Sequence, residues 1–171
     1  SAASDVYKRQ IDPCAIRFTM RAAVDGASPT AAEKKKMVEN PNRQRVLNFL
    51  EVLSCGDIEG ALSCCSDDVD FFANTPIDIL PHMGHHRGKA ELRQMWTTIH
   101  ARYSGMRYEI PIMVSEGDKV AANFRVFFRK SRNDRIVQFD MAAFYTLRDG
   151  RIAGIRARLS GSIFAVQGAR H

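Results

Sequence analysis

The sequence predicts an α+β fold in which helices precede an antiparallel sheet. Helical spacing of apolar residues is confined to residues 43–103, whereas residues 106–161 form four strand-like segments joined by short turns. These turns contain glycine, aspartate or asparagine, which favour hairpins, so consecutive strands should be antiparallel neighbours. Helices followed by strands, with one strand between the helices, are typical of the α+β class.

The first two helices should meet at a tight turn. The first is expected to begin after "ENPN", with Asn42 as its N-cap. Its apolar residues recur at helical spacing at Val46, Leu47, Leu50 and Leu53. Gly56 suits the position just after a helix end, and Asp57 can cap the second helix, "IEGALSCC".

A short strand, "DVDFFAN", should follow the second helix and lead through a loop to the third helix, near residues 89–103. The apolar stripe of that helix comprises Leu92, Met95, Trp96, Ile99 and Tyr103. The four later strands are "MRYEIPIMVS", "KVAANFRVFFRK", "RIVQFDMAAFYTL" and "RIAGIRARLSG". We therefore expect one sheet packed on the helices.

The chain of 171 residues suits a single domain, which we place at residues 37–171. Residues 1–36 are aperiodic and end in "ASPTAAEKKK", so we expect a disordered or non-native N-terminal extension. The segment "SDVYKRQ" in particular resembles adapter read-through. Met20 or Met37 would then be the natural start.

Composition favours a cytoplasmic globular protein with no nucleic-acid or membrane partner. Half of the net charge of +6 lies in residues 1–36, and the other basic residues are scattered without a basic block. No apolar run approaches the roughly 18–20 residues that span a bilayer, and the start lacks a secretory signal. The four cysteines have no metal-ligand spacing, and we expect them to stay reduced.

Three segments, "CGDIEGAL…DDVDFF", "GHHRGKAEL…W" and "FYTLRDGRIAGIRARL", carry a resemblance to the nuclear transport factor 2-like superfamily. Over about residues 43–161 the chain resembles its SnoaL-like, ketosteroid isomerase-like and limonene epoxide hydrolase-like branches. The resemblance implies a cone, in which a strongly curved antiparallel sheet wraps around about three N-terminal helices. It also implies an apolar pocket, a homodimer formed through the outer sheet face, and neither metal nor cofactor.

The epoxide hydrolase mechanism is disfavoured because its polar residues are missing. The family motif Y-x-N-x-P is matched by Phe72, Asn74 and Pro76, so the tyrosine hydroxyl is absent. Phe127 and Ala157 stand where the resemblance places the two aspartates. Without these carboxylates, water cannot be activated in that way.

The ketosteroid isomerase mechanism is disfavoured for the same reason. It needs a carboxylate base near the end of the first strand, where this chain has Ala73 and Asn74. It also needs a tyrosine on the first helix and an aspartic acid on the third long strand, where Phe49 and Ala143 stand.

The resemblance still indicates which side chains face the pocket. It turns Phe139, Met141, Ala143 and Tyr145 inward on the third long strand, and Arg125 and Phe127 inward on the second, beneath Trp96. The expected ligand-binding residues are Phe72, Asn74, Trp96, Arg125, Phe127, Phe139 and Met141. The candidate catalytic residues are Asp140, His85 and Tyr145. Any of the apolar residues could instead be simple core.

Arg125 is placed differently by two arguments. Strand alternation puts a wholly apolar set on one face, which would normally face inward: Val120, Ala122, Phe124, Val126 and Phe128. Arg125 would then lie outside. The resemblance places it inside, and we follow the resemblance. If the next strand slips by one residue, Asp140 becomes the carboxylate near the pocket.

Three histidines lie close together in "PHMGHH": His82, His85 and His86. This spacing matches no metal-ligand pattern, so we interpret the segment as an irregular loop at the pocket rim. His85 or His86 could contact the ligand and transfer protons, since imidazole titrates near neutral pH. His100, in the third helix, is expected at the surface.

The sequence therefore predicts a SnoaL-like protein that binds a small, mostly apolar organic ligand. If it is an enzyme, an isomerase, cyclase or lyase using general acid–base catalysis fits best. The alternative is a non-catalytic ligand-binding or dimerisation module. Two or more titratable groups converging on one cavity would favour the enzyme, and an all-apolar cavity would favour the module.

Overall fold

The computed structural model of the chain describes residues 40–75, 80 and 82–166. The helices and strands in these ranges are α3 (Pro41–Ser54), α4 (Ile58–Ser63), β1 (Cys65–Asn74), β2 (His85–Arg87), α5 (Gly88–Arg102), β3 (Tyr103–Glu116), β4 (Lys119–Lys130), β5 (Ile136–Arg148) and β6 (Arg151–Val166). The α+β prediction is confirmed. The expected extension over residues 1–36 lies outside the described residues. No helix in the described ranges is long and apolar enough to cross a bilayer.

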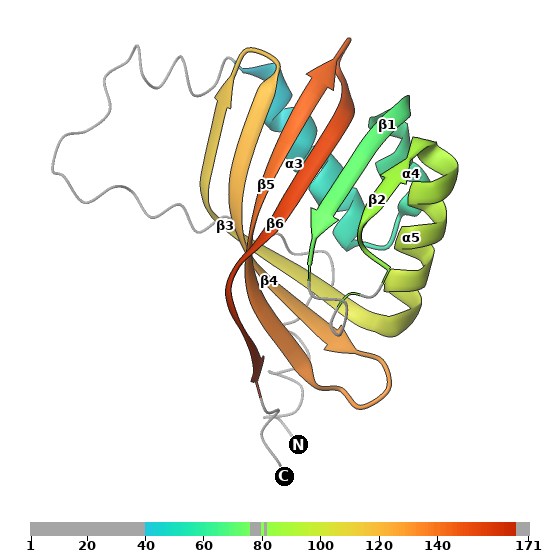
Figure 1. Cartoon of the computed structure of the whole chain (residues 1–171), viewed down its shortest axis with the longest axis vertical. Helices are drawn as coiled ribbons and strands as arrows, with labels where there is room; N and C mark the ends of the chain where they lie inside the picture. Colours follow the sequence, from blue (N-terminus) through green and yellow to red (C-terminus); the bar gives the residue numbers. More distant parts are fainter. Residues whose placement is uncertain (1–39, 76–79, 81, 167–171) are drawn as a thin grey trace, which may run out of the picture.

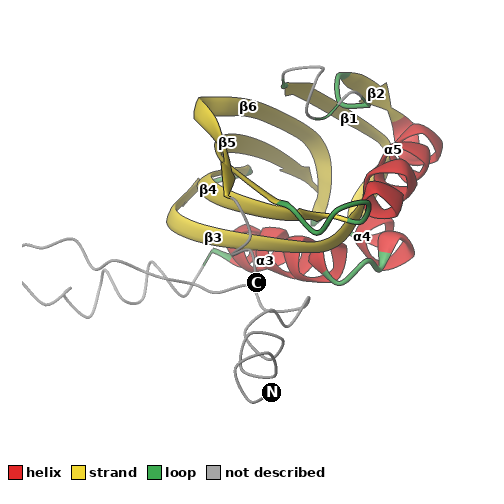
Figure 2. Ribbon diagram, turned by 90° about the horizontal axis from the view of Figure 1, so that it is seen from below, coloured by secondary structure: helices red, strands yellow, loops and turns green. Residues whose placement is uncertain are grey.

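The strands form one six-stranded sheet in the order β2-β1-β6-β5-β4-β3 (Figure 1). Strands β3 to β6 are the predicted antiparallel meander. β1 lies parallel to β6 and antiparallel to β2. Figure 2 shows the sheet curving round on itself, with the helices closing the open side of the curve. The concave face is therefore covered by helices, and none of the described helices lies on the convex face.

The first helix begins two residues earlier than the sequence indicated. Asn40, not Asn42, is the N-cap: its side-chain oxygen accepts a hydrogen bond from the backbone N–H of Asn42 at 3.0 Å. Pro41 occupies the first helical turn, where its missing N–H costs nothing. The side chain of Asn42 instead donates to the carbonyl of Gly117 at 2.9 Å, which ties the helix to the β3–β4 turn.

The predicted turn between the first two helices is confirmed. Gly56 has a φ of +81°, a left-handed conformation that glycine adopts without a steric penalty. Asp57 caps α4 by accepting a hydrogen bond from the N–H of Gly60 at 2.8 Å. These two residues set the angle at which α4 leaves α3.

The sequence predicted an irregular loop for the histidine segment, and this is wrong for its last part. Residues His85–Arg87 form β2, which pairs with Asp70, Phe71 and Phe72 of β1. A three-residue strand is too short to show a two-residue alternation, so no periodic signal could reveal it. It forms because the free edge of β1 carries backbone groups that need partners.

The two arguments for the orientation of β4 disagreed, and the structure agrees with the alternation of apolar and polar residues along the strand. Its apolar set is buried: Val120, Ala122, Phe124, Val126 and Phe128. Arg125 lies on the opposite face, with its Nε 3.3 Å from Oδ1 of Asp140. Phe127 also lies on that face, 4.1 Å beneath the guanidinium of Arg107. The inward orientation expected for Arg125 and Phe127 is therefore wrong. Burying an unpaired guanidinium costs far more than leaving it in water.

The cysteines are only partly as expected. Cys64 and Cys65 are free, and Cys65 is fully buried. Burial, and then the neighbouring thiol of Cys64, raises the pKa of Cys65 to about 12, so this thiol stays protonated. Cys55 is disulfide-bonded, so the expectation of reduced cysteines is wrong for this one.

We expect Phe124→Ala to lower the free energy of unfolding by about 3–5 kcal/mol, because it removes a buried aromatic ring from the core. Phe127→Ala is the matched control on the opposite face of the same strand, and its cost should stay below about 2 kcal/mol. Denaturant unfolding of both variants measures the difference. Equal losses would contradict the orientation of β4.

Candidate functional site

A cavity lies between the concave face of the sheet and the helices α3 and α5. Its volume is about 70 Å³. That is several times the roughly 10–15 Å³ needed to hold one water molecule. Its walls are formed by Phe49, Leu50, Leu53, Phe71, Met83, Trp96, Ile99, His100, Met106, Tyr108, Phe128, Met141, Ala143, Tyr145, Ile155 and Ala157.

The cavity exists because two of the inward-facing residues of the sheet are alanines, which leave space between the sheet and the aromatic side chains around them. Ala143 and Ala157 are register partners on the neighbouring strands β5 and β6, and both are buried. Phe49 and Trp96 line the cavity from the helices, and the ring of Phe49 lies 5.6 Å from Trp96 and 6.2 Å from Tyr145, which follows Ala143 on β5. Two methyl groups cannot fill the space that larger side chains would occupy, so room for a ligand remains.

Two of the polar side chains in the wall are tyrosines. Burial raises the pKa of the Tyr108 phenol far above its ordinary value. The pKa of Tyr145 is also raised, first by burial and then by the nearby Tyr108 and Cys65. Both phenols therefore stay protonated at neutral pH and remain hydrogen-bond donors. Among the described residues, the Tyr108 hydroxyl has a partner only in the sulfur of Met106, a weak acceptor at 4.0 Å.

The third polar residue is His100, which the sequence analysis placed at the surface. It lines the cavity, and its Nε2 is buried without a hydrogen-bond partner among the described residues. Burial lowers the pKa of the imidazole from its ordinary 6.5, although the carbonyl of Leu53 opposes the change. His100 follows Trp96 by four residues on α5 and so shares its inner face. That spacing was the signal available in the sequence.

Four of the predicted site residues lie on the concave side, three of them buried and Met141 partly buried. Trp96, Met141 and Tyr145 line the cavity. Phe139 is buried beside it, with its ring 5.5 Å from that of Phe128. The structure brings these side chains to one place, and the roles assigned to them remain predictions.

Phe72 and Asn74 lie on the other face of β1. Phe71 and Ala73 are the buried residues of this strand, and the residues after each of them point outward. Phe72 is 38% exposed, and its ring contacts that of His85 rather than the cavity. The expectation that both side chains line the pocket is therefore wrong. In a strand, successive side chains point to opposite faces, and here the residues that point inward are their neighbours Phe71 and Ala73.

Asp140 also lies outside the cavity. It is the register partner of Arg125, and the two form an ion pair on the convex face of the sheet. The one-residue slip that would have turned Asp140 inward does not occur, because Phe139 and Met141 take the inward positions. Asp140, Arg125 and Phe127 therefore do not contact the cavity.

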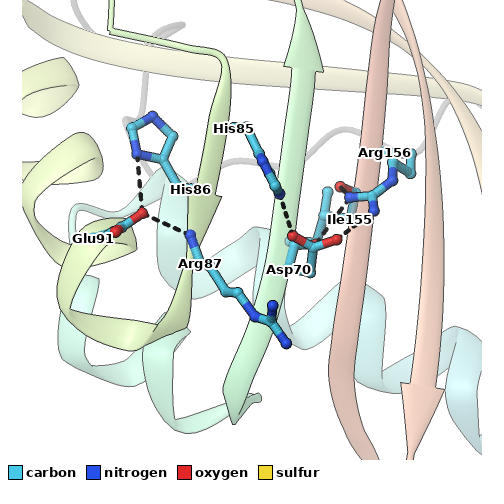
Figure 3. A network of polar contacts seen from close by, with 7 residues as sticks. All are labelled: Asp70, His85, His86, Arg87, Glu91, Ile155 and Arg156. Atoms are coloured by element: carbon cyan, nitrogen blue, oxygen red, sulfur yellow. Dashed lines mark hydrogen bonds and ion pairs between the residues drawn. The ribbon is translucent and has the colours of Figure 1, made fainter.

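His85 belongs to a polar network on the sheet surface rather than to the cavity wall (Figure 3). Its Nε2 lies 2.6 Å from Oδ1 of Asp70, whose second oxygen accepts a hydrogen bond from Arg156. Arg156, and then His85, hold the pKa of Asp70 below its ordinary value. The carboxylate thus stays ionised between two basic side chains. Arg156 faces outward.

The neighbouring His86 is tied to the same end of the sheet. Its Nε2 lies 2.8 Å from the carbonyl of His82, and its Nδ1 lies 4.0 Å from Oε2 of Glu91. The same carboxylate oxygen accepts a hydrogen bond from the N–H of Arg87 at 2.7 Å, at the start of α5 (Figure 3). Among the described residues, no three histidine, cysteine or acidic side chains are grouped so that they could hold a metal ion.

A sequence-family model described as "SnoaL-like domain" matches residues 46–155. Comparison with curated proteins gives no significant match. Three solved structures illustrate the similarity in fold. TerC, co-crystallised with polyporic acid, has 21% identity and a TM-score of 0.63, with 71% of this chain and 92% of that chain covered.

The second structure is a nuclear transport factor 2-like protein from Burkholderia pseudomallei. It has 16% identity and a TM-score of 0.63, with coverage of 71% of this chain and 92% of that chain. The third is an LEH-like epoxide hydrolase of M. tuberculosis, with 18% identity, a TM-score of 0.57, and coverage of 70% and 83%. At such identities the similarity establishes a common fold, that of nuclear transport factor 2-like proteins.

The lowered pKa of His100 makes folding depend on pH. Between the pKa in the folded protein and 6.5, the unfolded chain binds more protons at this residue, so acid favours unfolding. We expect the stability that neutral His100 contributes to be complete above pH 6.5 and to decline as the pH falls below it. In His100→Gln this part of the pH dependence should disappear, as measured by denaturant unfolding between pH 5 and 7.5. Identical pH profiles for the two proteins would contradict the burial of the imidazole.

Proposed function

Since this chain belongs to the SnoaL-like domain family, we propose that its cavity binds a small, mostly apolar organic ligand. One observation carries this proposal: the described residues of the cavity wall are apolar except for three polar side chains, Tyr108, Tyr145 and His100. Apolar walls provide affinity for an apolar body, and a few placed polar groups fix its orientation. The solved structure of TerC with polyporic acid, an organic acid in a protein of the same fold, supports this class of ligand.

We infer further that the protein is an enzyme, an isomerase, cyclase or lyase that needs no cofactor. General acid–base catalysis requires one group that accepts a proton and another that donates one. A neutral imidazole at His100 can accept, and the protonated phenols of Tyr108 and Tyr145 can donate. Titratable groups on one cavity favour an enzyme over a purely binding module, in which an all-apolar wall would suffice.

Epoxide hydrolysis is not part of this proposal, despite the similar fold of the LEH-like structure. Ala157 lines the cavity at the position where the resemblance places an aspartate. Phe127, where the other aspartate is expected, lies on the convex face under Arg107. Among the described residues that form the cavity wall, none is a carboxylate that could activate a water molecule by that route.

We also propose that the protein is a homodimer formed through the convex face of the sheet. Ile112, Val114 and Phe144 are 57%, 59% and 55% exposed there. Register places Val114 beside Ala121, and Ala121 beside Phe144, so these side chains form a continuous apolar row across three strands. Monomers rarely leave such a patch in contact with water, and a two-fold axis lets it cover itself.

The ligand proposal is tested by screening small lipophilic acids, ketones and lactones for thermal stabilisation. A ligand at 100 times its Kd should stabilise by about 2.7 kcal/mol, which raises the melting temperature by several degrees. We expect Ala143→Leu, which fills the cavity, to abolish this shift, whereas Ala142→Leu on the opposite face of β5 should retain it. Failure of every compound, or equal shifts in both variants, would count against the cavity as the binding site.

Light scattering at micromolar concentration tests the dimer, and the wild type should have twice the mass of one chain. We expect Phe144→Lys to shift the mass towards the monomer, because it places a charge in the apolar row. Thr97→Lys, at an exposed position on α5, should leave the mass unchanged. A monomeric wild type would refute the proposal.

A further inference from the structure

The apolar row on the convex face continues across the sheet into β1. Phe144, which stands beside Ala121 in that row, has Arg156 of β6 as its register partner on the other side. Arg156 in turn has Phe72 of β1 as its register partner. We call this set, which crosses five strands, the convex row: Phe72, Arg156, Phe144, Ala121 and Val114. An arginine thus stands between two exposed phenylalanines.

The charge of Arg156 is neutralised within its own chain. Its Nη2 donates a hydrogen bond to the carboxylate of Asp70, and its Nη1 lies 3.4 Å from the backbone carbonyl of the same residue (Figure 3). Gly154, the register partner of Asp70, has no side chain, which leaves room for the guanidinium to reach back along the sheet. Nε2 of His85 lies 2.6 Å from the other carboxylate oxygen and holds the carboxylate from the far side. Asp70 therefore accompanies the arginine wherever the row makes contact.

This neutralisation favours a second copy of the chain over an acidic partner. In a two-fold interface, side chains near the axis meet their own copies, so a free arginine there would face another arginine. Like charges brought together in this way oppose association. Arg156 is neutralised, whereas Arg158, two positions further along β6, has no ion pair among the described residues. An acidic partner would instead need the guanidinium of Arg156 to be free.

We propose that the convex row forms the centre of the homodimer interface, and that Asp70 makes this possible by neutralising Arg156 there. This inference rests on the proposed homodimer, and it extends the contact surface from three strands to five. Removing the rings of Phe72 and Phe144 from water drives association. The guanidinium between them is buried together with its counter-ion, because a charge buried without its partner is strongly unfavourable.

Dissociation constants of the dimer, measured by sedimentation or light scattering over a dilution series, test this inference. We expect Asp70→Asn to raise the dissociation constant about tenfold or more, since the arginine then enters the interface without its counter-ion. Asp68→Asn is the matched control, because it also removes a carboxylate of β1 that pairs with an arginine. That arginine, Arg148, lies beside the β5–β6 turn and outside the convex row, so the dissociation constant should stay within about twofold.

A double variant distinguishes an uncompensated charge from a folding defect. Asp70→Asn combined with Arg156→Met removes both charges, so we expect the dissociation constant to return to within about threefold of the wild type. If the double variant stays as weak as Asp70→Asn, or if Asp70→Asn dimerises as tightly as the wild type, the inference is overturned and the homodimer stands. A monomeric wild type refutes the homodimer and the inference together.

The wild type also provides a test that does not depend on any variant. The NMR signal of the Arg156 Nε–H should shift as the dimer dissociates on dilution, whereas that of the Arg148 Nε–H should stay in place. An Arg156 signal that does not move while the dimer dissociates refutes the inference.

Discussion

The pairing of β1 with β6 joins the helical half of the molecule to the meander. The two strands run parallel, and Asp70–Asn74 meet Gly154–Arg158 about 84 residues further along the chain. The backbone of Cys64 also accepts a hydrogen bond from the N–H of Ile152 at 2.9 Å. Because α4 leads directly into β1, and α5 follows it through β2, this pairing holds the helices over the concave face. The cavity depends on it, since without the helices the inward side chains of the sheet would meet water.

Much of the fold could be predicted from local signals, and the parts that could not are those that depend on distant partners. Gly56 and Asp57 marked the turn between the first helices, and short hairpin turns marked the meander. β2 was missed because its three residues are a strand only by virtue of lying beside β1. The β1–β6 pairing was missed for a similar reason, since nothing within either segment specifies its neighbour.

The site was predicted less well than the fold, and the orientation of β4 shows why. Its five alternating apolar residues specified the inner face, yet the resemblance turned Arg125 inward. Distant relatives share a backbone, but each sequence places its own charges where water or a partner can reach them. His100 was missed for the opposite reason, because a lone polar residue beside an apolar stripe was read as exposed. In this cavity, the polar groups come from α5, β3 and β5 rather than from the strand ends that the motifs indicated.

The far edge of the sheet is formed by β3, which among the described strands pairs only with β4. An edge of 14 residues would ordinarily invite a strand from another chain to extend the sheet. Here the register of β3 shifts between Glu109 and Ile112, and Pro111 within that interval has no N–H to offer. A strand docking along this edge would lose its hydrogen-bond ladder halfway. The register shift and the proline thereby make this edge a poor template for growth into fibrous aggregates.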